Sequence, residues 1–264
     1  MPRLTDLARV RARLDRDPAW SAYAMGDLSP AFARYAEWHH SPDDEAVVLV
    51  YREFTEPIVF AIGPPERIGP LFAEIEADAI TLQLQPDVMP RLAPRFVVEV
   101  THPMWRMQLD VAAFSPPALT GVEPLTPADV DAIRELYADG DAAGEAPDFF
   151  APSMLDAGLF FGVREAGTLV AAAGPHIVAP DMGICAIGNV YTRRDRRGRG
   201  YGQRVTAAVA AGAMARGVQT IVLNVRHRNA VARRVYERLG FVARVDFCEG
   251  FARRALAGEA TAGR

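Results

Sequence analysis

The chain has 264 residues, half of them hydrophobic and 23% charged, which is the balance of a globular protein with a sizeable core and room for two domains. All 29 basic residues are arginine, so the sequence excludes enzyme classes that need an active-site lysine: pyridoxal phosphate enzymes, phosphate-loop NTPases and protein kinases. A net charge of −4 argues against a general nucleic-acid binder, whose surface would carry a basic surplus.

The segment before residue 115 predicts a mixed α/β half. Apolar residues recur at helical spacing up to Leu14, and further helices are predicted over Ala19–Leu28 and Glu66–Glu76. Segments rich in β-branched or aromatic residues, mostly separated by proline or glycine, predict strands. These strands cover Ala46–Arg52, Ile58–Ile62, Ile80–Leu84, Phe96–Val100 and Trp105–Leu109.

The dipeptide Pro116-Pro117 is the predicted seam, because consecutive prolines continue neither a helix nor a central strand. We therefore predict domains at residues 1–117 and 118–264. The second begins with a helix start at Thr126, followed by Pro127 at the first helical position and Asp129 in the first turn.

The second half predicts a sheet with one βαβ crossover. After a loop at Gly144–Ser153, a strand, a hairpin and a further strand alternate with two helices. The predicted strands are Leu159–Val163, Leu169–Val178, Met182–Tyr191, Thr220–Val225 and Phe241–Phe247, and the helices are Tyr201–Ala215 and Ala230–Leu239.

An arginine-rich and glycine-rich segment lies between the strand that ends at Tyr191 and the helix that starts at Tyr201. Five of the seven residues Arg193–Arg199 are arginine, and Gly198, Gly200 and Gly202 follow in alternation. Glycine lets the main chain approach a ligand closely, and the N-terminus of the next helix offers free N–H groups and a partial positive charge. This position favours a pyrophosphate site.

Three other interpretations fit this segment less well. A solvated basic loop does not account for the glycine spacing at a strand-to-helix junction. A dinucleotide-binding loop needs GxGxxG, whereas the chain has GxGxG at Gly198–Gly202. An arginine-glycine segment that binds RNA is typical of disordered tails, and this one is embedded in folded sequence.

The spacing Arg197-x-x-Gly200-x-Gly202 resembles the acyl-CoA pyrophosphate signature of the GNAT superfamily of N-acetyltransferases. The downstream segment from Leu223 to Phe241, with Asn229-x-x-Ala232-x-x-x-Tyr236, resembles the second half of that family's cofactor site. The stretch Ala186–Thr192 is similar to the glycine N-acyltransferase-like branch. That branch implies a degenerate acetyltransferase-like N-terminal half, and residues 1–115 contain no RxxGxG.

The resemblance implies a mixed, mostly antiparallel sheet of acetyltransferase type with helices on both faces, preceded by a second, smaller α/β half. It also implies that the pantetheine arm of acetyl-CoA pairs with main-chain groups of Val190 and Thr192, and that the N–H near Val190 faces the thioester oxygen. The residues expected to hold the phosphates are Arg197, Gly198, Arg199, Gly200, Tyr201, Gly202 and Gln203.

Two asparagines complete the expected cofactor site. Asn229 starts a helix, where it either contacts the cofactor or serves as a helix cap. Asn224 is a polar residue in an apolar strand and needs a hydrogen-bond partner if it is buried.

Tyr236 lies two helical turns past Asn229 and is the expected acid that protonates the departing thiolate, with a core tyrosine as the alternative. His176 is a candidate base because histidine titrates in the right pH range. A carboxylate acting through water stays open as the base, with Glu145, Asp148 and Glu249 as candidates.

The predicted function is an N-acyltransferase that moves the acyl group of acetyl-CoA, its co-substrate, to a primary amine of a small molecule or amino acid by direct attack. The alternative is a non-catalytic acyl-CoA-binding regulatory module. Cys185 and Cys248 lack companions at metal-ligand spacing, so no metal is expected. No segment has the apolar length of a signal peptide or membrane span. We expect a cytoplasmic protein without nucleic-acid or membrane partners, and a homodimer stays open.

Overall fold

The computed structural model describes residues 7–141, 143–147 and 149–256. Contacts divide the chain into two units. Unit 1 holds the described residues of Met1–Arg106, Arg226–Arg228 and Ala243–Arg264, and unit 2 holds those of Met107–Val225 and Asn229–Val242. Two long strands, β5 (Phe96–Leu109) and β11 (Phe241–Arg254), therefore contribute residues to both units.

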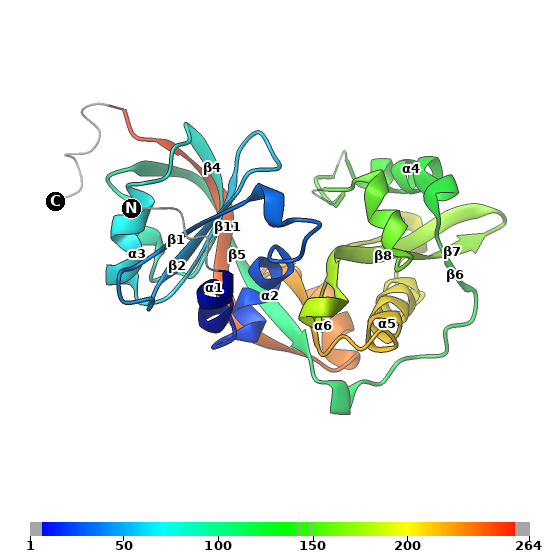
Figure 1. Ribbon diagram of the computed structural model, residues 1–264. Coiled ribbons are helices and arrows are strands. Elements are labelled where there is room, and N and C mark those ends of the chain that lie inside the picture. The colour runs from blue at the N-terminus through cyan, green and yellow to red at the C-terminus, as the bar shows by residue number, and fades with distance from the viewer. Residues whose placement is uncertain (1–6, 142, 148, 257–264) are drawn as a thin grey trace. The chain divides into compact units, whose positions relative to one another are not determined.

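Unit 1 is a sheet in the order β1-β2-β3-β4-β11-β5 (Figure 1). The pairs β1-β2, β2-β3 and β4-β11 are antiparallel, and β3-β4 is parallel. Its elements before β5 are α1 (Leu7–Leu14), α2 (Pro18–Gly26), β1 (Ala36–His40), β2 (Val47–Tyr51), β3 (Ile58–Ile62), α3 (Pro65–Phe72) and β4 (Ala79–Leu84).

Helix α3 makes the crossover between the parallel strands β3 and β4. Its buried residues Ile68, Leu71 and Phe72 join the apolar side chains of β2, β3 and β4 in one core cluster. Ile68 and Phe72 are fully buried, and side chains three or four apart lie on the same face of a helix. This apolar face holds α3 against the sheet.

Unit 2 is a sheet in the order β10-β9-β8-β7-β6, antiparallel throughout except for the parallel pair β10-β9. Figure 1 shows α4 and α5 on opposite sides of β8. The elements are β6 (Val122–Pro124), α4 (Val130–Asp141), β7 (Phe161–Glu165), β8 (Thr168–Ala179), β9 (Ile184–Thr192), α5 (Tyr201–Met214), β10 (Thr220–Arg226) and α6 (Ala230–Arg238). Short 3₁₀ segments lie between them, including η5 (Pro152–Ala157) and η7 (Arg194–Arg196).

Small side chains let α5 pack closely on the sheet. The helix has 14 residues and buries a stripe of alanine and valine. Gly212 lies so close to Leu159 that a Cβ there would stand 2.7 Å from the leucine side chain. On the other face of the sheet, α4 buries Ile133, Leu136 and Tyr137 in a second core cluster.

The predicted fold class, a mixed and mostly antiparallel sheet with helices on both faces, is confirmed. Four strand predictions need correction. Strand β6, which has only three residues, was not predicted. Strand β1 was not predicted, because Glu37, His39 and His40 hide its pattern. Phe96–Val100 and Trp105–Leu109 form the single strand β5, which continues through Pro103. Strand β11 extends to Arg254 instead of ending at Phe247.

The two units do not coincide with the predicted ranges 1–117 and 118–264. The reason is that β11 pairs with β4 from Cys248 to Arg253, so the end of the chain lies in the sheet of unit 1. In the ranges that the structure describes, no helix has both the length and the apolar character that crossing a membrane requires.

Candidate functional site

A glycine-containing loop joins β9 to α5 in unit 2. Gly198 and Gly200 have φ angles of 78° and 77°, in the left-handed region that glycine enters at little cost. A Cβ added at either residue would meet no atom within 4 Å, so the space beside the main chain is open. Gly200 is the N-cap of α5 and gives no side-chain cap. The first N–H groups of α5 therefore suit an anion, because they lack intrahelical acceptors at the positive end of the helix.

Glu165, at the end of β7, holds the side chains of this loop. Its carboxylate accepts hydrogen bonds from Arg196 Nε at 2.8 Å, from Arg199 Nη1 at 3.2 Å and from the Tyr201 hydroxyl. The Tyr201 hydroxyl and the guanidinium groups keep the pKa of Glu165 below its ordinary value. Arg199 and Tyr201, both predicted to bind the cofactor, thus use side-chain atoms to fix the loop. Arg199 bonds to Glu165 through Nη1, and its side chain is 52% exposed.

Arg197 connects the loop to the end of β9 and to the segment after α4. Its Nη2 lies 2.7 Å from Glu145 Oε2, and its Nε donates to the Thr192 carbonyl at 3.2 Å. The hydrogen bond from Arg197 lowers the pKa of Glu145. A ligand phosphate that binds the Arg197 guanidinium would compete with Glu145 for it.

Asp139 of α4 fixes the point where β9 enters the loop. Its Oδ2 accepts the Arg194 main-chain N–H and the Tyr191 hydroxyl, each at 2.9 Å. These two bonds, with that from Arg194 N–H the larger cause, lower the pKa of Asp139. Glu165 and Asp139 were not identified from the sequence, because no spacing pattern marks a carboxylate that contacts a loop about 30 to 55 residues away.

Strands β9 and β10 separate beside the loop. Their parallel pairing runs from Ile184↔Thr220 to Ile187↔Leu223 and goes no further. On the other side, β9 stays paired with β8 up to Thr192↔Ala171. Because the Arg193 N–H donates to the Val170 carbonyl and main-chain groups alternate in direction along a regular strand, those of Thr192 point away from β8. Val190 and Thr192, the two residues predicted to pair with pantetheine, both lie in the part of β9 that β10 does not pair.

A bulge at Asn189 accompanies this separation. The three residue steps of β9 from Gly188 to Tyr191 lie opposite the two steps of β8 from Gly174 to Ala172. Asn189 has a φ of 53°, an unusual value for a residue with a side chain. The Tyr137 hydroxyl of α4 donates to the Asn189 carbonyl at 2.9 Å and holds the bulge in place.

The predicted asparagines occupy two elements of unit 2. Asn224 is half-buried in β10, beyond the last residue of β10 that pairs with β9. Asn229 is the N-cap of α6, and its Oδ1 accepts the Ala232 N–H at 3.0 Å. Its side-chain oxygen therefore has the cap role, and its amide nitrogen is the group that could bind a ligand.

Tyr236 is buried on α6, with its ring edge-on to Phe241 at a centroid distance of 6.1 Å. Burial raises the pKa of Tyr236 to about 12. The hydroxyl is therefore fully protonated at neutral pH, which an acid must be.

His176 lies in β8 at a second irregularity of the β8-β9 pairing. Its ring covers Gly188, and a Cβ at Gly188 would overlap the ring. His176 thus lies beside the residue that precedes Asn189. Of the other candidate bases, Glu145 pairs with Arg197, Glu249 belongs to unit 1, and Asp148 lies outside the described residues.

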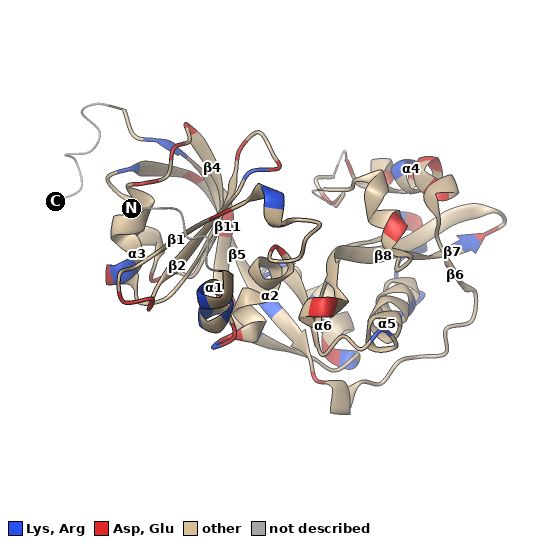
Figure 2. Cartoon of the chain, in the orientation of Figure 1, with Lys and Arg blue, Asp and Glu red and all other residues tan. Residues whose placement is uncertain are grey.

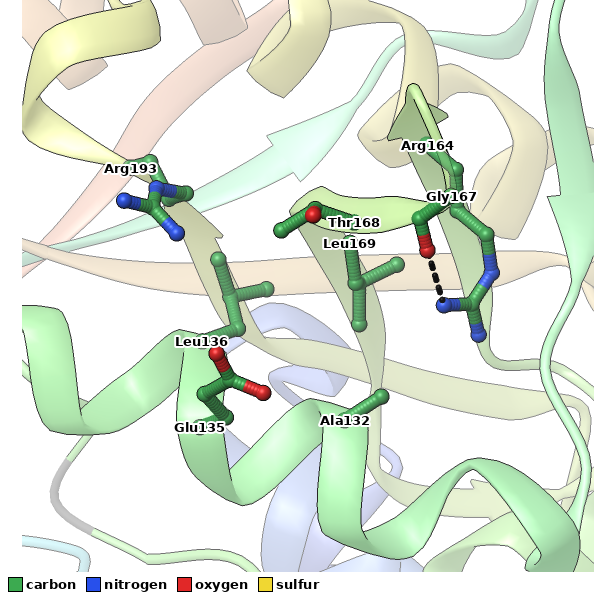
Figure 3. A pocket seen from close by; sticks show the side chains of 8 residues that line it. All are labelled: Ala132, Glu135, Leu136, Arg164, Gly167, Thr168, Leu169 and Arg193. Carbon is green, nitrogen blue, oxygen red and sulfur yellow. Dashed lines mark hydrogen bonds between the residues drawn. The ribbon is translucent and has the colours of Figure 1, made fainter.

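A separate pocket of about 150 Å³ lies between α4 and the turn from β7 to β8 (Figure 3). It contains none of the predicted site residues and is lined by charges of both signs, and Figure 2 shows acidic and basic residues along α4. Its lining residues are Ala132, Glu135, Leu136, Arg164, Gly167, Thr168, Leu169 and Arg193. In the described residues, no group of three or more His, Cys, Asp or Glu side chains could hold a metal ion.

Comparison with solved structures gives the class of fold. The structure is similar to a GNAT-family protein of Novosphingobium aromaticivorans, with a TM-score of 0.64 and 24% identity over 90% of this chain and 99% of that one. A Drosophila protein has a TM-score of 0.67 with 12% identity, covering 96% and 97% of the two chains. A GCN5-related N-acetyltransferase of Kribbella flavida has a TM-score of 0.58 with 18% identity, covering 96% and 98%. The fold is therefore that of GNAT acetyltransferases.

The comparison with family models covers a smaller part of the chain. Residues 130–241 match the model of the acetyltransferase (GNAT) family. This range begins at α4, includes the Gly198–Gly202 loop and ends at the first residue of β11. No curated protein compared with the chain matches it.

Proposed function

We propose that the chain is an acyl-CoA-dependent N-acyltransferase that transfers the acetyl group of acetyl-CoA to a primary amine of a small molecule or amino acid. The observation that carries this proposal is the separation of β9 from β10 at the place where β9 leads into the Gly198–Gly202 loop and α5. One end of this opening offers unpaired main-chain groups and the other an anion site. The GNAT match over residues 130–241 supports the same assignment.

In this proposal the loop and the first turn of α5 bind the pyrophosphate of acetyl-CoA. The main-chain N–H groups of residues 198–203 bind the phosphates, while Glu165 holds Nη1 of Arg199 and the hydroxyl of Tyr201 and so keeps the loop in shape. The guanidinium of Arg197 adds a charge once it leaves Glu145. Main-chain groups of Val190 and Thr192 bind the pantetheine arm as a neighbouring strand would.

The bound thioester supplies an activated acyl carbon. The Val190 N–H stabilises the negative charge that develops on the carbonyl oxygen. His176 takes a proton from the attacking amine, and Tyr236 gives one to the departing sulfur. The pKa of about 12 for Tyr236 keeps this proton in place before the reaction. A thiol in the same buried setting also has a raised pKa, so the difference between the pKa of Tyr236 and that of the leaving thiol becomes smaller.

We also propose that unit 1 is a degenerate copy of the acetyltransferase fold without a cofactor site. Its strands β1 to β4 have the same pairing as β7 to β10: two antiparallel pairs and then a parallel pair around a helix. Where unit 2 has the glycine loop, unit 1 has Pro64 and Pro65, which have no N–H, and Glu66 in the first turn of α3. Missing donors and a negative charge both oppose phosphate binding.

A pair of glycine substitutions tests the cofactor site. Gly200→Asp places a carboxylate at the N-cap of α5, beside the expected pyrophosphate. Gly217→Asp is the matched control, since Gly217 has a φ of 79°, compared with 77° for Gly200, and an added Cβ meets nothing within 4 Å at either place. We expect Gly200→Asp to weaken acetyl-CoA binding at least tenfold by calorimetry, or about 1.4 kcal/mol, and the control to change it less than twofold.

Activity is measured as thiol release from acetyl-CoA with a panel of amines. Release that depends on the amine supports an acyltransferase, whereas tight acetyl-CoA binding without release under any condition indicates a non-catalytic binding module. Equal affinity of Gly200→Asp and the wild type would show that the loop is not the cofactor site.

A further inference from the structure

Asn189 is a buried polar residue in an otherwise apolar strand. The residue is 3% exposed, lies in β9 and adopts the left-handed φ of the bulge. A buried amide in such a place needs hydrogen bonds, because moving an amide out of water without a new partner costs free energy. Its side chain therefore calls for a partner.

The carboxamide of Asn189 is only half satisfied. Its Nδ2 donates to the sulfur of Met154 at 3.4 Å, and its Oδ1 is buried with no hydrogen-bond partner among the described residues. A thioether sulfur accepts hydrogen bonds and donates none, so the nitrogen must be the atom that faces Met154. The oxygen is then the orphaned acceptor, and it can bind an N–H donor.

The position of Asn189 connects this acceptor with the reacting groups. Asn189 directly precedes Val190, whose main-chain N–H is assigned to the thioester oxygen. It directly follows Gly188, which the His176 ring covers. The orphaned oxygen and the proposed oxyanion donor thus come from adjacent residues of β9, and the proposed base lies beside them on the neighbouring strand β8.

The neighbouring side chains are apolar. Met154 of η5 and Phe150 pack on the cluster that contains Tyr137, and the Phe149 side chain is 39% exposed. Two carboxylates on this side of the sheet are already engaged: Asp139 accepts hydrogen bonds from Tyr191 and Arg194, and Glu145 from Arg197. The N–H···S contact with Met154 is weak, and a methionine side chain is flexible enough to make way for a ligand.

Resting on the proposed function, we infer that the Asn189 carboxamide oxygen positions the acceptor by accepting one N–H of the attacking amine, and that the acceptor is a primary monoamine with an apolar body. A neutral primary amine has two N–H groups and one lone pair. One N–H binds Asn189, the other faces His176, and the lone pair forms the C–N bond as the C–S bond breaks. His176 takes the proton of the amine, and the sulfur receives the proton of Tyr236.

The test compares acceptors and variants. The acceptor probe is 2-phenylethylamine, with N-methyl-2-phenylethylamine as a one-N–H control and spermidine as a polycation. Asn189→Gly removes the carboxamide and keeps a residue that tolerates a φ of 53°. Asn189→Asp keeps acceptor oxygens in the same shape. Acceptor KM, kcat, acetyl-CoA Kd and the thermal midpoint are measured for each, together with 2-phenylethylamine binding to protein saturated with coenzyme A.

We expect 2-phenylethylamine to be preferred over both other amines at least tenfold in kcat/KM. Asn189→Gly should raise the KM and the Kd for 2-phenylethylamine at least tenfold and change the Kd for acetyl-CoA less than twofold. Asn189→Asp should bring the KM and Kd for 2-phenylethylamine most of the way back to the wild-type values. An unchanged KM and Kd in Asn189→Gly, or a parallel loss of acetyl-CoA binding, would overturn the role of Asn189. A preference for spermidine would overturn the acceptor class. Amine binding without any thiol release in the wild type would instead refute the proposed function.

Discussion

Replacing Tyr137 by phenylalanine tests how the bulge in β9 is held. The Tyr137 hydroxyl is the donor to the Asn189 carbonyl at 2.9 Å, and both residues are buried. A buried acceptor that loses its donor costs about 1–3 kcal/mol, and a left-handed non-glycine residue persists only while its surroundings hold it. We therefore expect Tyr137→Phe to lower the free energy of unfolding by about 1–2 kcal/mol, and the thermal midpoint by about 2–8 °C.

Tyr191→Phe is the matched control for this change. The Tyr191 hydroxyl also joins β9 to α4 at 2.9 Å, but it donates to Asp139, whose side chain is 21% exposed and keeps the Arg194 N–H as a donor. Water can replace the lost hydroxyl there, so we expect less than about 1 kcal/mol. Calorimetric unfolding gives both midpoints, and thiol release gives activity. Equal midpoints for the two variants, or full activity in Tyr137→Phe, would refute the idea that this bond holds the bulge.

Two further predictions concern the acid and the number of cofactor sites. Tyr236→Phe should lower kcat by about 10²–10⁴ and leave the acetyl-CoA Kd unchanged. We expect the lower end of this range because a thiolate is already a tolerable leaving group. Because the pKa of Tyr236 is about 12, wild-type activity should show no alkaline loss from this group below about pH 10. Full turnover in the variant would assign the acid elsewhere. Titration calorimetry should give one acetyl-CoA per chain, since Pro64, Pro65 and Glu66 oppose phosphate binding in unit 1, and a second micromolar site would contradict the proposal.

Local patterns predicted most elements because they depend on neighbours along the chain. The predicted helix over Tyr201–Ala215 and strand over Thr220–Val225 agree with α5 and β10 within one residue at each end. Strand β1 was not predicted because Trp38 is its only large apolar residue. The extension of β11 was not predicted for another reason. Its pairing with β4 places Gly250 opposite Leu82, and no local pattern indicates a partner so far away in the sequence.

The candidate site shows the same limit. The glycines of the loop and the order of strand and helix could be predicted from the sequence, because these features act through the main chain. The contacts of Glu165 with Tyr201 and of Glu145 with Arg197 depend on how separate elements pack, and the sequence does not encode them as a spacing. Asn189 could have been found by the argument applied to Asn224, since both are polar residues within apolar strands.

The path of β11 has a consequence for dividing the protein into fragments. Residues 243–254 lie in the sheet of unit 1, next to β4, although residues 241 and 242 belong to unit 2. Expression of residues 1–117 alone would leave β4 with an open edge in the middle of its sheet. Expression of residues 118–264 alone would leave a long strand without its partners, ready to pair with another molecule. A shortened form suited to crystallisation or screening therefore has to keep the last strand together with the first hundred residues.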